Sequence, residues 1–169
     1  MKLKFLLNTL EIDGPIKVGE QIGNFYLTTI DNKRVELEQI KGKWSILSFY
    51  PAINTVTCSA QLKWFFSENH SFRDQIKIIN ISADKPEVIT KHLKKKGHTQ
   101  TKQKTVYSDY DGFSFGKQAG VLIKKKKMLC RGVMVIDENR MVKYVQIVPR
   151  IEKQVDFNNL ITFLEKIED

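Results

Sequence analysis

The sequence predicts an α/β fold, in which a central mixed β-sheet is flanked by helices. Near-continuous apolar runs at residues 44–50, 76–82 and 132–136 are typical of strands that are buried on both faces. Segments with the apolar spacing of helices separate these runs. The chain has 169 residues and no linker, repeat or low-complexity block, so we expect a single domain over residues 1–169.

The N-terminal segment is expected to form a short strand. Its first residues begin like a signal peptide, but Asn8, Glu11 and Asp13 interrupt the apolar stretch and no small-residue cleavage site follows. The turn signal at residues 13–15 is expected to end this strand. We therefore expect a cytoplasmic protein.

The remaining elements alternate between strands and helices. Strands are expected at residues 25–30, 35–37, 44–50, 76–82, 105–109, 132–136 and 142–148. Four helices are expected. The first follows the loop 52–57, the second follows residues 83–86 and ends near residue 96, the third covers residues 113–119, and the fourth lies at the C-terminal end. This order, a hairpin, then β-α-β-α-β-α, then a hairpin and a helix, is typical of a thioredoxin-like fold with an extra N-terminal β-hairpin. Asp84 is a candidate N-cap, and Asp156 or Asn158 another.

The composition is basic and poor in cysteine. There are 28 Lys and Arg residues against 19 Asp and Glu, a net charge of +9, and much of the excess lies in two lysine runs, residues 94–96 and 124–127. Neither run is interleaved with aromatic residues, so the sequence favours solvated surfaces over a nucleic-acid partner. No apolar run is long enough to span a membrane. Two cysteines exclude a disulfide-rich scaffold and a four-cysteine zinc site.

The three histidines do not form a metal-binding pattern. His70, His92 and His98 are not spaced with carboxylates or cysteines as metal ligands are. We expect them at the surface and expect no metal site.

Cys58 is the candidate reactive residue. The predicted secondary structure places it in the first turn of the helix that follows the strand 44–50, where free N–H groups and the helix dipole favour a thiolate. Thr55 can direct its hydroxyl to the same spot, and Pro51 can shield the pocket. A buried, inert cysteine is the alternative, but this combination favours peroxide chemistry, in which a hydroxyl and N–H groups hold both peroxide oxygens in line for the thiolate.

The stretch Pro-Ala-Ile-Asn-Thr-x-x-Cys at residues 51–58 resembles the motif of bacterial thiol peroxidases, the atypical 2-Cys peroxiredoxins. Residues 19–25, 81–86, 131–139 and 144–157 are similar to that family in the same order. The resemblance therefore covers nearly the whole chain.

This resemblance implies a thiol-dependent peroxidase that reduces hydrogen peroxide and organic hydroperoxides. It implies that Cys58 is oxidised to a sulfenic acid, that Thr55 is its hydrogen-bond partner and that Arg131 steadies the thiolate and orients the peroxide. It also implies a homodimer, reduction by thioredoxin or another thiol, and no metal or organic cofactor. The run 124–127 belongs to the loops near the family's dimer interface, where four like charges must point outward or weaken the dimer.

The sequence departs from this family at the resolving cysteine. The position that the family gives to this residue is Leu93, and no cysteine lies between Cys58 and Cys130. In addition, Asn54 replaces the family's Asp, and Lys63 replaces an Arg.

Cys130 is the remaining candidate for a resolving residue. It adjoins Arg131, and alternation along a strand would direct its side chain away from the pocket, which favours a structural thiol. Three routes of recycling stay open: direct reduction in a one-cysteine cycle, a disulfide with Cys130, and a disulfide between two subunits. A redox sensor or binding protein with weak turnover is the alternative function.

Overall fold

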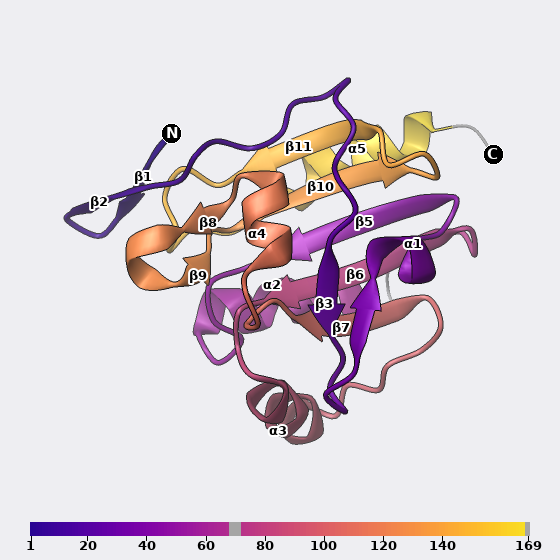
Figure 1. Cartoon of the computed structure of the whole chain (residues 1–169), viewed down its shortest axis with the longest axis horizontal. Coiled ribbons are helices and arrows are strands. Elements are labelled where there is room, and N and C mark those ends of the chain that lie inside the picture. Colours follow the sequence, from indigo (N-terminus) through magenta and orange to yellow (C-terminus); the bar gives the residue numbers. More distant parts are fainter. Residues whose placement is uncertain (68–71, 168–169) are drawn as a thin grey trace.

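The computed structural model describes residues 1–67 and 72–167 and contains the predicted α/β fold. Its main sheet has seven strands in the spatial order β11-β10-β5-β6-β7-β3-β4 (Figure 1). The strands are β3 (Tyr26–Thr28), β4 (Arg34–Glu36), β5 (Trp44–Phe49), β6 (Ile76–Ser82), β7 (Lys104–Ser108), β10 (Gly132–Asp137) and β11 (Val142–Ile147). Neighbouring strands from β5 to β7 are parallel and the other pairs are antiparallel, so the sheet is mixed, as predicted.

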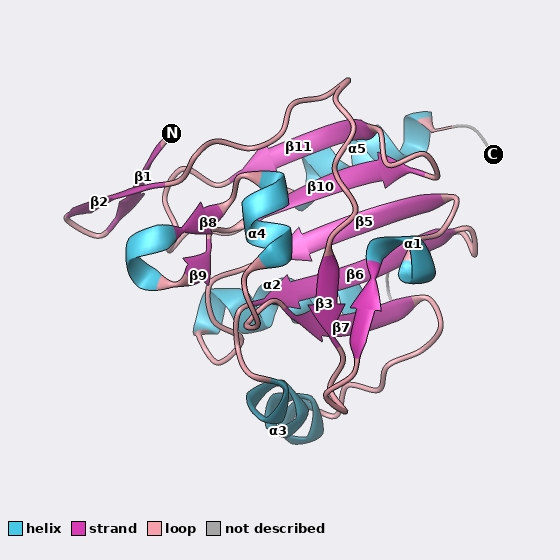
Figure 2. Cartoon of the chain, in the orientation of Figure 1, coloured by secondary structure: helices cyan, strands magenta, loops and turns pink. Residues whose placement is uncertain are grey.

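Helices cover both faces of this sheet (Figure 2). They are α1 (Leu37–Ile40), α2 (Val56–Phe66), α3 (Pro86–Lys96), α4 (Ser114–Ala119) and α5 (Phe157–Lys166). Successive residues of β5 serve opposite faces: Ile46 packs with residues of α2 and α5, whereas Leu47 packs in the cluster that contains Phe115 of α4. This alternation explains why the strand reads as a continuous apolar run.

The N-terminal segment differs from the prediction of a single strand. It forms a separate hairpin of β1 (Lys2–Phe5) and β2 (Asn8–Glu11), in which Leu3 and Leu10 face each other and are buried. Leu6 makes the turn with a φ of 54°. The sequence offers no Gly or Asn at this turn, which is why the hairpin was not predicted. The predicted hairpin at residues 25–37 is present as β3 and β4.

A second small hairpin carries the lysine run 124–127. It consists of β8 (Leu122–Ile123) and β9 (Met128–Leu129), joined by the 3₁₀ turn Lys124–Lys126. All four lysines of this run are exposed, as the sequence predicted. Two residues per strand are too few for a periodicity signal, so the hairpin itself was not anticipated.

The predicted helix caps were partly wrong. The N-cap position of α3 is Lys85, and Pro86 begins the helix, where its missing N–H has no consequence. Asp84 instead accepts hydrogen bonds from Ile53 N and Ser82 Oγ, each at 2.8 Å. At α5 the prediction holds for Asp156, which accepts from Asn159 N.

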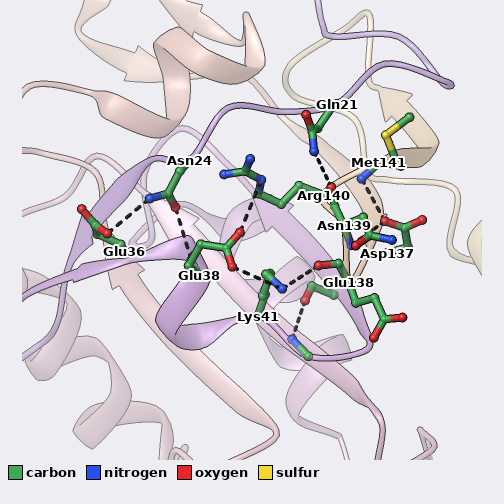
Figure 3. A network of polar contacts seen from close by, with 12 residues as sticks. Gln21, Asn24, Glu36, Glu38, Lys41, Asp137, Glu138, Asn139, Arg140 and Met141 are labelled. Carbon is green, nitrogen blue, oxygen red and sulfur yellow. Dashed lines mark hydrogen bonds and ion pairs between the residues drawn. The ribbon is translucent and has the colours of Figure 1, made fainter.

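A network of hydrogen bonds and ion pairs lies at one end of the sheet (Figure 3). Glu38 of α1 forms ion pairs with Lys41 at 3.5 Å and with Arg140 at 3.4 Å, and Gln21 Nε2 donates to Asn139 O at 2.8 Å. Antiparallel pairing puts Asp137 beside Trp44 at this end, and Gly132 beside Phe49 at the other. The residues that follow β5 and precede β10 therefore meet at the far end from this network.

None of the helices in residues 1–67 and 72–167 has the length and apolar character needed to cross a membrane.

Candidate active site

Cys58 is the third residue of α2, at the end of the sheet where β5 leads into that helix (Figure 1). Thr55 holds the N-cap position, and the first helical bond runs from Ser59 N to Thr55 O at 2.8 Å. The N–H of Cys58 lies in the first turn, which has no carbonyl four residues earlier in the helix to accept from it. The side chain is 1% exposed. The predicted position of the thiol at the positive end of a helix is therefore correct.

Arg131 donates three hydrogen bonds around this thiol. Its Nη2 lies 3.4 Å from Cys58 Sγ, Nη1 lies 3.0 Å from Gln61 Oε1, and Nε lies 3.0 Å from Ile151 O. Arg131 is 2% exposed. It was predicted to open the strand but lies in a bend just before β10. The three bonds fix the plane of the guanidinium, so that one edge faces the sulfur.

Gln61 is a residue that the sequence reasoning missed. It is fully buried on α2, and its Nε2 donates to Ser48 Oγ at 2.9 Å and Phe49 O at 3.2 Å, while its Oε1 accepts from Arg131. Spacing was the available signal, since residues three apart on a helix share a face and Gln61 follows Cys58 by three. Gln61 thereby ties Arg131 to the end of β5.

Close packing at Gly132 holds the backbone next to Arg131. A Cβ at this position would overlap Gln146 O of β11 and lie 2.8 Å from the ring of Phe49. Only glycine allows so close an approach. The position of Arg131 thus depends on three strands meeting at a residue without a side chain.

The charge of Arg131 is not balanced by an acid. Across residues 1–67 and 72–167, no carboxylate forms an ion pair with Arg131. Its acceptors are an amide oxygen, a backbone carbonyl and the sulfur of Cys58. A buried cation is costly unless a negative charge compensates it. Among the described residues, Arg131 therefore places an uncompensated positive charge next to Cys58 Sγ.

Thr55 and Pro51 lie where the sequence placed them, around one cavity with Cys58. The hydroxyl of Thr55 donates to Ala52 O at 3.0 Å, and no hydrogen bond joins it to Cys58 among the described residues. Its lone pairs remain able to accept from a ligand in the cavity.

This active-site cavity has a volume of about 430 Å³ and a mainly apolar lining. Phe5 and Leu10 of the N-terminal hairpin contribute to it, together with Met128 and Ile151. Lys126 of the exposed lysine run and Glu152 add charged groups. A first strand was predicted in the N-terminal segment, but its hairpin partner β2 and the strand β9 were not, so this apolar wall could not be anticipated.

Cys130 lies in different surroundings. It is fully buried and packs in the core cluster that includes Phe115 and Leu129, whereas Cys58 packs with Tyr50 and Leu62. Burial raises the pKa of the Cys130 thiol from 9.0 to about 12. Both cysteines are free. The expectation that Cys130 points away from the pocket agrees with this packing, although the residue lies outside a strand.

The prediction of surface histidines was wrong for His92. This residue is 5% exposed, and its Nε2 lies 3.4 Å from Ser59 Oγ. His98 is half-buried and stacks on Phe66, and His70 falls outside the described residues. Within the described ranges, no cluster of His, Cys, Asp and Glu could hold a metal ion.

Comparison with known proteins identifies the family of this chain. The model of the AhpC/TSA family matches residues 18–145. A thiol peroxidase of Streptococcus sanguinis is 32% identical over 164 residues, which cover 96% of this chain and 98% of that protein. The chain belongs to the AhpC/TSA family, among its thiol peroxidases. A Bacillus subtilis thiol peroxidase is 33% identical over 147 residues, which cover 83% of this peroxiredoxin and 86% of that protein.

Solved structures confirm the peroxiredoxin form of the thioredoxin-like fold. A peroxiredoxin-like protein from Aquifex aeolicus superposes with a TM-score of 0.86 at 23% identity, covering 98% of this chain and 96% of that one. A thiol peroxidase from Chromobacterium violaceum gives a TM-score of 0.79 at 15% identity, covering 98% and 95%. The predicted fold class is therefore correct, including the early hairpin that the sequence placed at residues 25–37.

Proposed function

We propose that Cys58 is the peroxidatic residue of this thiol peroxidase. The observation that carries this proposal is the contact of 3.4 Å between Arg131 Nη2 and Cys58 Sγ at the N-terminus of α2. A thiolate held by a buried guanidinium and facing a cavity is a nucleophile prepared for attack.

The reaction transfers one oxygen to sulfur. The Cys58 thiolate attacks the nearer peroxide oxygen, an S–O bond forms as the O–O bond breaks, and the leaving oxygen takes a proton to become water or an alcohol. Arg131 and the N–H groups of the first turn of α2 stabilise the charge on the leaving oxygen. Thr55 accepts from the peroxide and aligns it, and Pro51 shields the sulfur from bulk water.

The cavity supports organic hydroperoxides as substrates beside hydrogen peroxide. A volume of about 430 Å³ is within the range of small-molecule sites. The apolar wall of Phe5, Leu10, Met128 and Ile151 provides contact for an alkyl group.

The sulfenic acid at Cys58 is then reduced in a one-cysteine cycle. A reductant thiol displaces water to form a mixed disulfide, and a second thiol releases Cys58 as the thiolate. Leu93 occupies the position where the family has its resolving cysteine, and Cys130 is buried in another part of the core with a pKa of about 12. A thiol so rarely ionised is a poor partner for exchange. Thioredoxin or another thiol serves as the reductant.

The proposal includes a homodimer of this chain. The exposed run 124–127 lies beside the cavity. Because the family's dimer interface is near these loops, we propose a homodimer in which like charges repel and which tightens as salt increases.

The missing cysteine at position 93 favours the second candidate, a redox sensor whose oxidised form ordinary thiols do not recycle.

A peroxide-consumption assay with a thiol reductant tests these roles. We expect Cys58→Ser to abolish turnover and Cys130→Ser, the matched control, to retain it. Wild-type turnover in Cys58→Ser would refute the role of this residue, and a strong loss in Cys130→Ser would refute the one-cysteine cycle. A single turnover without recycling would favour the sensor. Mass spectrometry of the peroxide-treated protein distinguishes a sulfenic acid from a disulfide.

A further inference from the structure

A second hollow lies between α2 and α3, beside the active-site cavity and separate from it. Its volume is about 700 Å³, and we refer to it as the basic groove. Four lysines line it: Lys63 of α2, and Lys91, Lys95 and Lys96 of α3. Lys91 and Lys95 are four residues apart on the same side of α3, and Lys96, next to Lys95, also lines the groove.

Among the described residues, no acid forms an ion pair with the lysines of the basic groove. All four lysines are exposed. No Asp or Glu of the described ranges is among the lining residues. Asp84, just before α3, accepts hydrogen bonds from Ile53 N and Ser82 Oγ, and Glu87 of α3 is not among the groove's lining residues.

Burial and the positive charges of the basic groove lower the pKa of two histidines. His92 and His98 line the basic groove. Burial first, then Lys96, lowers the pKa of His92 below 6.5, and burial first, then Lys63 and Lys96, lowers the pKa of His98 below 6.5. Lys63 also acts on His98, across the groove from α2. Cations from both helices therefore act on the same space.

We propose that the basic groove binds a small anion that carries a chain of phosphates, as in a nucleoside triphosphate or an inorganic triphosphate. Lysine ammonium groups are compact charges that bind phosphate oxygens without demanding one geometry. Ser59 and Asn54 add a hydroxyl and an amide that can donate to phosphate oxygens. The volume of the hollow matches a ligand of this size.

Two other classes of anion fit the groove less well. Protein interfaces are depleted in lysine and enriched in aromatic residues, and the lining contains neither Trp, Tyr nor Phe. Single-stranded nucleic acids also need aromatic side chains on which bases stack. A concave site whose described lining has no Trp, Tyr or Phe therefore favours a small phosphate compound over an acidic protein or a nucleic acid.

The proposal is independent of the peroxidase chemistry and is tested by binding. Isothermal titration of the full chain with sodium triphosphate and with ATP, without divalent cations, is expected to show saturable binding of one anion per chain. Tighter binding of ATP than of triphosphate would assign part of the site to the apolar side chains of Val56 and Val88, and equal binding would assign it to the phosphates alone. Both results support the proposal.

Matched variants decide whether the groove is responsible. We expect Lys91→Gln with Lys95→Gln to weaken binding by about tenfold or more, since each removes one ionic contact. Lys125→Gln with Lys127→Gln removes the same two charges from the other run, outside the groove, and is expected to change affinity by less than about twofold. The thermal midpoint checks that each variant folds. Should the α3 pair fail to fold, Lys63→Gln on α2 tests the same groove.

Three results would overturn the proposal. The first is no saturable binding to the unmodified chain. The second is an equal loss in both lysine pairs, which would show general attraction to a net charge of +9. The third is tighter binding of single-stranded DNA than of triphosphate with many nucleotides per chain, which would identify a nucleic-acid surface.

Discussion

Two hollows flank the first turn of α2 and share the exposed side chain of Val56, but they treat positive charge in opposite ways. In the active-site cavity, each nitrogen of one buried guanidinium donates a hydrogen bond, to Ile151, Gln61 and Cys58. In the basic groove, four exposed lysines have no fixed partner within the described residues. The first arrangement acts at short range on one atom, and the second creates a field over a volume.

Replacing Arg131 is expected to separate the two sites most clearly. Arg131→Met removes the donor at Cys58 Sγ and should lower kcat/KM for hydrogen peroxide by about 100- to 1,000-fold, the usual effect of losing one charge-stabilising donor. Triphosphate affinity should stay unchanged. Steady-state kinetics and titration calorimetry on the same preparation measure both. A turnover within tenfold of the unmodified enzyme would contradict the role of Arg131.

A carboxylate at position 61 is expected to compete with the thiolate for Arg131. Gln61→Glu keeps the oxygen that accepts from Arg131 but makes it negative. The new carboxylate then compensates the charge of the guanidinium, which stabilises a thiolate at Cys58 less. We expect alkylation of Cys58 by iodoacetamide at pH 7 to slow by about tenfold, the effect of roughly 1.4 kcal/mol. Gln118→Glu, on the exposed face of α4, adds the same charge far from the site. An equal rate in Gln61→Glu and this control would contradict the prediction.

The groove histidines are expected to make the free energy of unfolding fall in acid. Burial and neighbouring lysines hold the pKa of His92 and His98 below 6.5 in the folded chain, and unfolding removes this effect. Below pH 6.5 the unfolded chain binds more protons, so stability is lost as the pH falls. Urea unfolding at pH 7.5 and 5.5 measures this. The double variant His92→Gln, His98→Gln should show a smaller difference between the two pH values, and an unchanged difference would contradict the assignment.

Salt is expected to have the smallest effect on catalysis. Between 50 and 500 mM NaCl, turnover with hydrogen peroxide should change by less than about twofold. Hydrogen peroxide is neutral, and the charges on Cys58 and Arg131 are buried and therefore weakly screened. Triphosphate binding should weaken steeply over the same range, as exposed lysines are screened. Parallel salt dependence in the two assays would show that the sites are not distinct in the way their burial implies.

The sequence predicted the parts of the site that depend on one element. The strand 44–50, the position of Cys58 in the first turn and the strand after Arg131 follow from apolar runs and from helix ends, which are local properties. The strands observed at β5, β6 and β10 lie within one or two residues of the prediction.

Features that depend on distant contacts were not predictable in the same way. Phe5 and Leu10 reach the cavity because a hairpin without a turn signal folds against it, and His92 is buried because α3 packs on α2 next to Ser59. The predicted cap at Asp84 failed for a related reason, since its carboxylate is engaged by the loop before α2. Tertiary contacts override local preference in each case.

The absence of a side chain at Gly132 helps to judge whether a related sequence can form the same site. In a chain that keeps the thiol and the arginine at the equivalents of positions 58 and 131, any larger residue after the arginine would meet the ring of Phe49 and the backbone of β11. Such a chain must spread its sheet at this end and draw the guanidinium away from the sulfur. A search for active relatives, or a transplant of this site onto another scaffold, should therefore treat the dipeptide Arg131-Gly132 as one unit.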